Sequence, residues 1–526
     1  MKWTIPQPFN LVDLMDRHAG SDRVAIRWCN ETGLEREVTY AELKTLSERV
    51  AKGLIAAGLQ RGDRILLLLP RVPEAYIAYM GALKAGLVVL PGSEMLQSAD
   101  ITYRLQHAEA VAVIMDGSMV PRVDQAVHEA PAVRWGWVVN GEKNDRWNDF
   151  YRLGDGAEGV NLPKISADDV AFLSYTSGTT GGPKGVIHLH RWSLAHHRVA
   201  SQQWLDIREG DCVWATAGPG WAKWIWSPFL STLASGATAL VYQGRFDPEK
   251  ALALMEEKQV QVLCCTPTEY RMMAKVEGLE RFDLSHLRSA VSAGEPLNRE
   301  VIDTFRRHFQ VEVRDGYGQT ENTLLVGTLK DMKVKPGSMG KPTPGNQVEI
   351  IDEKGNPVSV GEVGNIAVHK DAPALFAGYY RDEERTRHAF RGQWYLTGDQ
   401  ARRDEGGYFW FEGRSDDIII SSGYTIGPFE VEDALVKHPA VRECAVVASP
   451  DPVRGSVVKA FVVIKTGYET NESLRRDLQS HVKKITAPYK YPRELEFISE
   501  LPKTTSGKIR RVELRQLEKE RKRRFP

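Results

Sequence analysis

Residues 170–185 read VAFLSYTSGTTGGPKG, an apolar run that predicts a buried strand and then a loop of glycines, small hydroxyl side chains and one lysine. Glycines let backbone N–H groups approach phosphate oxygens, the hydroxyls donate further hydrogen bonds, and Lys184 adds a positive charge. The loop is not a Walker loop, because Pro183 stands where that motif has glycine before the lysine. The pattern favours a polyphosphate-binding loop over the alternative, a flexible surface loop.

On both sides of this loop, apolar runs of strand length alternate with helical patterns. Thr39–Glu42 is a capping box that begins a helix with one apolar face, and Ile65–Leu69 is a continuous apolar run. Farther along, Val260–Cys265 predicts another buried strand and Asn298–Phe309 a helix. This alternation predicts an α/β fold whose sheets are of the parallel type and are covered by helices.

Beyond residue 414 the pattern of predicted helices and strands changes. Phe429–His438 and Glu472–Lys484 predict helices, and Cys444–Ala448 and Val458–Ile464 predict strands. About a hundred residues of this kind are enough for a domain with its own core. We therefore predict a large N-terminal domain over residues 1–414 and a small α+β domain over residues 415–526.

The composition is that of an ordinary soluble globular protein. Of the 526 residues, 42% are apolar and 26% charged, and the 69 Lys and Arg balance the 69 Asp and Glu, so nothing indicates a nucleic-acid partner. The longest aliphatic run, Ile65–Leu69, is far too short to span a bilayer. Five scattered cysteines without metal spacing, and no signal peptide, predict a cytoplasmic protein. The sequence leaves the oligomeric state unknown.

A second motif, Asp315–Glu321 (DGYGQTE), follows a predicted strand. In open α/β sheets, ligands bind beyond the carboxyl ends of strands. Tyr317 can stack on a base, Thr320 can bond a phosphate, and Glu321 can hold Mg²⁺ through oxygen. The alternative is a turn with a core tyrosine.

Three weaker motifs follow, of which the first in isolation indicates a plain turn and the last a solvated lysine. Tyr395–Asp399 ends in a carboxylate that suits the hydroxyls of a ribose. Arg414 and Asp416 lie at the predicted domain junction. Pro502–Lys508 places a lysine on a loop of glycine and hydroxyl residues near the C-terminus, where it can be carried into a site.

The five motifs in this order resemble the adenylate-forming superfamily of acyl-CoA synthetases, luciferases and peptide-synthetase adenylation domains, over nearly the whole chain. The chain looks most similar to the medium-chain acyl-CoA synthetases. That closer likeness rests on Tyr317–Glu321, Ser422–Tyr424 with Gly427–Glu430, Ser449–Gly455 and Ala487–Arg493.

The resemblance implies a small mobile C-terminal domain and a set of residues for ATP and Mg²⁺. The ATP-binding residues implied are Thr176, Ser177, Gly178, Thr179, Thr180, Gly181, Gly182, Pro183, Lys184, Asp315, Gly316, Tyr317, Gly318, Gln319, Thr320, Asp399, Arg414 and Lys508. Among these, Asp399 and Arg414 would bind the ribose. The catalytic residues implied are Lys508, Lys184, Glu321 and Thr320, with Glu321 as the Mg²⁺ ligand.

The resemblance also implies residues for coenzyme A and for movement of the small domain. The coenzyme A contacts implied are Ser422, Gly423, Tyr424, Arg454 and Lys483. Asp416 would be the hinge about which the small domain turns, withdrawing Lys508 and bringing Gly423 to the acyl group. One departure concerns Thr425, since relatives usually carry a phosphate-contacting arginine at that position.

The acyl pocket implied is lined by Trp221, Lys223, Trp224, Gly294 and Gly318. Acetate-specific relatives have tryptophan where this chain has Gly318, so we expect a deeper pocket. The tryptophans of residues 220–226 would refill part of it, unless Trp224 and Trp226 belong to the core. A pocket of intermediate size suits short-to-medium-chain, branched or aryl acids.

The function expected is therefore that of an acyl-CoA synthetase, which joins a small carboxylic acid to coenzyme A with ATP and Mg²⁺. The alternative function is that of a stand-alone adenylation enzyme that passes the acyl group to another acceptor, and the nearest rival class is a peptide-synthetase adenylation domain. Luciferase-like, peptide-synthetase and non-catalytic nucleotide-binding proteins also remain open. His188, His190, His196 and His197 lack a spacing that completes a metal site, and we expect them to be structural or surface residues.

Overall fold

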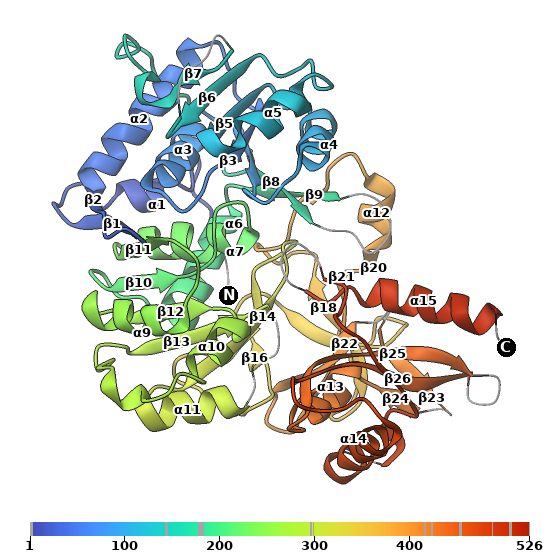
Figure 1. Cartoon of the computed structure of the whole chain (residues 1–526). Coiled ribbons are helices and arrows are strands. Elements are labelled where there is room, and N and C mark those ends of the chain that lie inside the picture. Colours follow the sequence, from blue (N-terminus) through green and yellow to red (C-terminus); the bar gives the residue numbers. More distant parts are fainter. Residues whose placement is uncertain are drawn as a thin grey trace. The chain divides into compact units, whose positions relative to one another are not determined.

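The computed structural model of the chain describes residues 4–141, 146–176, 183–294, 297, 299–414, 417–421, 424–451, 455–486, 488–503 and 508–524. Its contacts form two units (Figure 1). The first comprises Met1–Val348 and Val368–Gln393, and the second Glu349–Ala367 and Trp394–Pro526. This grouping follows packing, and the domain boundary after Arg414 stays a prediction.

Two large sheets form the frame of the first unit. The nine-stranded sheet has the order β16 (Lys341–Pro342), β15 (Leu324–Gly327), β14 (Val313–Gly318), β13 (Ser289–Ala293), β12 (Val262–Cys265), β10 (Cys212–Ala215), β11 (Thr238–Gln243), β1 (Val24–Asn30) and β2 (Glu35–Thr39). The eight-stranded sheet has the order β19 (Gly378–Tyr379), β9 (Lys184–Leu189), β8 (Val170–Thr176), β4 (Val88–Gly92), β3 (Arg64–Leu68), β5 (Ala112–Asp116), β6 (Trp135–Val139) and β7 (Asn148–Asp149).

The central strands of both sheets are parallel, and antiparallel pairs occur only near the edges. The run from β14 to β1 is parallel, and β2, β15 and β16 are antiparallel. In the other sheet β8, β4, β3, β5, β6 and β7 are parallel, whereas β9 and β19 are antiparallel. The predicted α/β class with parallel-type sheets is confirmed.

Helices cover the sheets of this unit. They are α1 (Asp13–Asp16), α2 (Tyr40–Ala56), α3 (Pro73–Lys84), α4 (Ser98–Ala108), α5 (Val120–Val127), α6 (Trp192–His196), α7 (Ala222–Trp224), α8 (Thr232–Ala234), α9 (Pro248–Glu257), α10 (Pro267–Met273), α11 (Arg299–Phe309) and α12 (Glu383–His388), with π-helical segments η3 (His197–Trp204) and η4 (Ile225–Ser231). The predicted capping box at Thr39 and Glu42 is present at the start of α2.

Alternation along β3 explains why both faces of its sheet need helices. Ile65 and Leu67 pack into the cluster that contains α2 and α3, whereas Leu66 and Leu68 pack into the cluster that contains α4 and α5. Figure 1 shows these two helix pairs on either side of the sheet. The continuous apolar run Ile65–Leu69 is therefore buried on both faces, as a central parallel strand requires.

The second unit is built from smaller sheets. Its strands are β17 (Val348–Ile351), β18 (Val363–His369), β21 (Trp394–Arg403), β22 (Phe409–Arg414), β23 (Ile419–Ser421), β24 (Tyr424–Ile426), β25 (Val441–Asp451), β26 (Gly455–Ile464) and β27 (Glu494–Phe497), and its helices are α13 (Pro428–Val436), α14 (Glu472–Ile485) and α15 (Arg511–Arg524). α13 and α14 contribute to one core with β25 and β26. The short β20 (Phe390–Arg391) precedes β21 in the chain.

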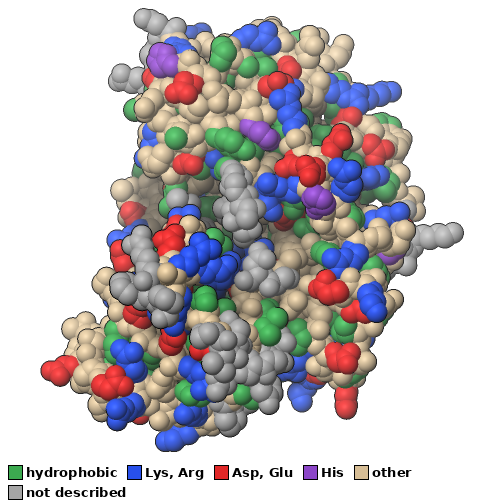
Figure 2. Space-filling view, turned by 90° about the vertical axis from the view of Figure 1, so that its right-hand side faces the viewer, with side chains coloured by type: hydrophobic (Ala, Val, Ile, Leu, Met, Phe, Trp, Pro, Cys, Tyr) green, Lys and Arg blue, Asp and Glu red, His purple; other side chains and the backbone are tan. Residues whose placement is uncertain are grey.

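No helix among the described residues has the length and apolarity needed to cross a membrane. Figure 2 shows Lys and Arg side chains interspersed with Asp and Glu on the face in view.

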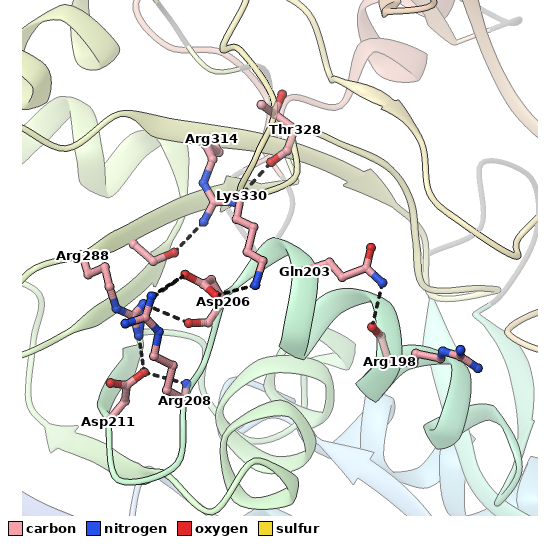
Figure 3. A network of polar contacts seen from close by, with 10 residues as sticks. Arg198, Gln203, Asp206, Arg208, Asp211, Arg288, Arg314, Thr328 and Lys330 are labelled. Carbon is pink, nitrogen blue, oxygen red and sulfur yellow. Dashed lines mark hydrogen bonds and ion pairs between the residues drawn. The ribbon is translucent and has the colours of Figure 1, made fainter.

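A network of charged side chains links the amino-terminal ends of β10, β13 and β14 in the nine-stranded sheet (Figure 3). The carboxylate of Asp206 lies 3.2 Å from both the Arg288 guanidinium and the Lys330 ammonium. Arg288, which immediately precedes β13, also pairs with Asp211 at 2.5 Å, and Asp211 immediately precedes β10. Nearby on β14, Arg314 donates to Ser289, and burial lowers the pKa of Arg314 to about 10. This edge is the one opposite to where ligands bind.

Replacing Asp206 with asparagine is expected to lower the free energy of unfolding by about 2 kcal/mol and to leave turnover unchanged. The change removes a charged hydrogen-bond acceptor from two cations, and asparagine still tolerates the φ of 54° at this position. Urea unfolding measures the loss. Asp303→Asn is the matched control, because the Asp303–Arg306 pair is exposed and such pairs contribute little. Equal stability of both variants would contradict the prediction.

Candidate active site

The predicted phosphate-binding loop connects two paired strands. Thr176 at the end of β8 lies opposite Lys184 at the start of β9, so the two described ends of the predicted loop belong to paired antiparallel strands. Ser177–Gly182, the central part of the predicted loop, lies outside the described residues. At its end, the Pro183 carbonyl accepts a hydrogen bond from the Tyr103 hydroxyl at 2.8 Å. Lys184 is half-buried.

The second motif lies at the carboxyl end of β14, where the parallel part of its sheet ends. Asp315 is buried, its Oδ1 accepts from Gly316 N at 2.8 Å, and burial raises the pKa of its carboxyl to about 7. Trp204 Nε1 donates to the Asp315 carbonyl at 3.2 Å. Tyr317, Gln319 and Thr320 follow as half-buried residues.

The course of the backbone around Gly318 explains why this residue is a glycine. A Cβ at this position would meet the Thr323 carbonyl oxygen at 2.1 Å, so any larger residue requires a different course of the loop. The sequence suggested that Gly318 deepens the acyl pocket, and that role stays a prediction. The close approach explains the glycine without reference to a substrate.

Glu321 is held by a segment that the sequence did not single out. Its Oε1 accepts a hydrogen bond from the Tyr379 hydroxyl at 3.0 Å, and its carbonyl accepts from Phe376 N at 2.8 Å. The Nζ of Lys184 lies 5.2 Å from the centroid of the Tyr379 ring. Two motifs that are far apart in the chain therefore meet at Tyr379, which sequence reasoning missed because residues 376–379 have no unusual composition.

A layer of buried rings from β9 and α6 supports the loop that carries Glu321. His188 Nε2 lies 2.5 Å from the Thr320 carbonyl, which makes it the donor. Trp192 Nε1 donates to the Asn322 carbonyl at 2.8 Å, and His196 Nδ1 lies 2.5 Å from Thr323 Oγ1. These histidines are thus core residues that hold the loop, in keeping with the structural role expected from the sequence.

The candidate acyl-pocket residues separate into two groups. Lys223 Nζ donates to the Ala293 carbonyl at 3.0 Å, next to Gly294 at the carboxyl end of β13. Trp221 is exposed. Trp224 is buried among aromatic rings of the core, with ring centroids 4.9, 4.7 and 5.3 Å from those of Tyr76, Tyr79 and Phe229. These contacts fit the core alternative for Trp224.

In the second unit, Asp399 and Arg414 lie opposite each other on β21 and β22. Arg414 Nε is 3.9 Å from Asp399 Oδ1; the carboxylate is buried and the guanidinium is exposed. A buried carboxylate beside an exposed guanidinium can present acceptor oxygens and N–H donors to a pair of hydroxyls. The structure thus brings together the two residues that the resemblance assigns to ribose.

The remaining predicted residues of this unit are only partly described. Asp416, Ser422, Gly423 and Arg454 lie outside the described residues, and Tyr424 is described only as the first residue of β24. Thr425 pairs with Ile420 in the β23–β24 hairpin. Lys483 Nζ lies 3.9 Å from the centroid of the Tyr491 ring.

Lys508 is exposed, next to the bridge between Lys503 and Ile509 that closes the base of its loop.

The donor chemistry at Glu321 fits Mg²⁺. Mg²⁺ is usually bound by one or two carboxylates together with substrate phosphates and waters. Among the residues that the structure describes, no three His, Cys, Asp or Glu side chains gather into a group that could hold a metal ion. A single half-buried carboxylate, bound to a tyrosine that also contacts a lysine, suits a cation that arrives with a polyphosphate.

Comparison with known proteins places the chain in a family. Residues 15–380 match the AMP-binding enzyme family and residues 430–508 match the AMP-binding enzyme C-terminal domain. An uncharacterized acyl-CoA ligase of Bacillus subtilis is 55% identical over 518 residues, which cover 98% of this chain and 97% of the relative. The mitochondrial acyl-coenzyme A synthetase ACSM3 of Rattus norvegicus is 40% identical over 533 residues, covering 98% and 92%. The chain belongs to the AMP-binding enzyme family.

Solved structures agree over almost the whole chain. An anthranilate CoA ligase in complex with anthranoyl-AMP matches with a TM-score of 0.89 at 28% identity, covering 98% of each chain. A benzoate CoA ligase from Burkholderia xenovorans matches with a TM-score of 0.82 at 32% identity, covering 96% of this chain and 100% of the other.

Proposed function

We propose that this enzyme is an acyl-CoA synthetase, an acid–thiol ligase that converts a carboxylic acid, ATP and coenzyme A into acyl-CoA, AMP and diphosphate. The observation that carries the proposal is that Lys184 and Glu321, from two separate motifs, both contact Tyr379. A lysine and a carboxylate at such a place suit the phosphates of ATP and their Mg²⁺. The relatives named as acyl-CoA ligases and synthetases support the same activity.

The first half-reaction overcomes the poor leaving group of a carboxylic acid. A carboxylate oxygen forms a bond to the α-phosphorus of ATP, and the bond from that phosphorus to the bridging oxygen of diphosphate breaks. The protein contributes positioning and charge stabilisation. Lys184 would neutralise the leaving diphosphate, Thr320 would bond a phosphate oxygen, and Lys508 would stabilise charge between carboxylate and α-phosphate. Mg²⁺ held by Glu321 would supply further charge neutralisation.

In the second half-reaction the thiol of coenzyme A attacks the acyl carbon. A carbon–sulfur bond forms, the bond from the acyl carbon to AMP breaks, and the thiol proton is released. A turn of the small domain at Asp416 would withdraw Lys508 and bring Gly423 toward the acyl group. Ser422, Tyr424, Arg454 and Lys483 would contact coenzyme A. Relatives usually carry an arginine where this chain has Thr425. We assign any effect of this difference to the second half-reaction.

The substrate proposed is a short-to-medium-chain, branched or aryl acid. We assign Gly318, Gly294, Lys223 and Trp221 to the acyl pocket, where the two glycines would leave space free of side chains at two positions. The solved ligases for anthranilate and benzoate support the aryl part of this range. The buried free cysteines are compatible with a reducing compartment, and we place the enzyme in the cytoplasm.

AMP release with and without coenzyme A tests the function and the substrate class together. We expect coenzyme A-dependent release, with kcat/KM at least ~10-fold higher for isobutyrate, 2-methylbutyrate, octanoate or benzoate than for acetate, because methylene groups in an apolar pocket have effects of this size. Acetate as the best substrate would contradict the argument from Gly318. If diphosphate release required the acid but did not change with coenzyme A, the result would favour a stand-alone adenylation enzyme that passes the acyl group to another acceptor.

A further inference from the structure

Tyr379 links the two residues that the proposed function assigns to the phosphates and their metal. Its hydroxyl donates to Glu321 Oε1 at 3.0 Å, and the ammonium of Lys184 lies 5.2 Å from its ring centroid. The side chain is buried, with 8% of its surface exposed. One phenol thus offers a hydrogen-bond donor to an anion and a π face to a cation.

The surrounding structure fixes the position of this phenol. Tyr379 N donates to Thr386 Oγ1 at 2.9 Å, and the residue pairs with Val186 where β19 joins β9, two positions after Lys184. The Phe376 ring lies edge-on to the phenol, with centroids 4.9 Å apart. Since Phe376 N also donates to the Glu321 carbonyl at 2.8 Å, one short segment holds both the main chain and the side chain of Glu321.

We propose that Tyr379 is a positioning residue for adenylate formation, an inference that rests on the proposed function. Its hydroxyl occupies one carboxylate oxygen of Glu321 and orients the other toward the metal that accompanies ATP. Partners of this kind set the orientation of a metal ligand and affect metal affinity strongly. The ring face keeps the Lys184 ammonium beside the same site, because a cation is attracted to the negative face of an aromatic ring.

Two substitutions at Tyr379 separate these effects. Tyr379→Phe removes the hydroxyl and keeps the ring, and Tyr379→Leu removes both. We expect the affinity of Tyr379→Phe for the Mg²⁺ complex of α,β-methylene-ATP, measured by calorimetric titration, to fall about 10-fold. Tyr379→Leu should bind more weakly still. Tyr380→Phe loses the same hydroxyl one residue along the chain and is expected to bind like wild type.

Half-reaction assays distinguish positioning from a general loss of structure. Tyr379→Phe should require a higher Mg²⁺ concentration for half-maximal ATP–diphosphate exchange, by a similar factor, and should convert pre-made acyl-adenylate to thioester at the wild-type rate. Wild-type binding of the magnesium–nucleotide complex by Tyr379→Phe, or equal loss of both half-reactions, would overturn the inference. Failure of the wild-type enzyme itself to bind this complex would instead refute the proposed function.

Discussion

Replacing Lys508 with alanine is expected to slow acyl-adenylate formation by about 10²–10³-fold, the usual cost of removing one group that stabilises developing charge. The side chain is exposed, so its loss should not change the stability of the fold. The thiol attack on a finished adenylate needs no charge at the α-phosphate from this lysine. Conversion of pre-made acyl-adenylate to acyl-CoA should therefore proceed at close to the wild-type rate. ATP–diphosphate exchange and single-turnover thioester formation measure the two steps.

Lys503 supplies the matched control for this experiment. It lies at the base of the same loop and pairs with Glu443 at 2.6 Å. Lys503→Ala removes the same charge from the same segment and is expected to leave both half-reactions within about twofold, as for other exposed ion pairs. If Lys508→Ala lost the two half-reactions equally, or kept both, Lys508 would not have the separate role that we assign to it.

The architecture was predictable because it is encoded in local patterns. Ile65–Leu69 is apolar at every position, which is typical of a short strand buried on both faces, and the apolar positions of Asn298–Phe309 recur with helical spacing. The structure places the corresponding elements at Arg64–Leu68 and Arg299–Phe309. Such patterns depend on neighbours in the chain, so one sequence is enough to recognise them.

Pairings between distant segments were not predictable in the same way. Tyr379 bonds to Glu321 because β19 pairs with β9 at the edge of the eight-stranded sheet. No local sequence pattern predicts that contact. Trp224 is a similar case, since a tryptophan suits a pocket and a core equally well. Its place was decided by Tyr76 and Tyr79, which lie more than a hundred residues earlier on α3.

Four buried histidines make the first unit sensitive to acid. Burial lowers the pKa of His188, His190 and His197 to about 4 and that of His196 to about 3, against an ordinary value of 6.5. Between pH 6.5 and 4 these side chains are neutral in the folded chain and protonated in the unfolded chain. Unfolding therefore takes up protons, and the stability that the neutral rings contribute above pH 6.5 is lost as the pH falls toward 4.

One buried carboxyl acts in the opposite direction. The raised pKa of Asp315, about 7, means that its folded form keeps a proton that the unfolded form releases above its ordinary value of 3.8. The contribution of protonated Asp315 to stability is full below pH 3.8 and is lost as the pH rises through 7. Within the window from pH 6.5 to 4, unfolding is thus accompanied by a net uptake of about three protons from these five groups.

We expect the free energy of unfolding to fall by about 4 kcal/mol for each pH unit below 6, because each proton taken up contributes about 1.4 kcal/mol per unit. A whole domain is stable by only about 5–15 kcal/mol, so a stability at the lower end of this range should be lost between pH 5 and pH 4. Urea unfolding followed by tryptophan fluorescence at several pH values measures the slope.

His190→Asn keeps an acceptor for Leu11 N, which His190 Nδ1 now binds at 3.1 Å, and should reduce the slope by about 1.4 kcal/mol per unit. The exposed His128 provides the control, because His128→Asn removes a ring that is in water in both states and should leave the slope unchanged. A flat profile from pH 7 to 5, or the same slope in His190→Asn as in wild type, would show that these rings do not control the acid stability of the fold.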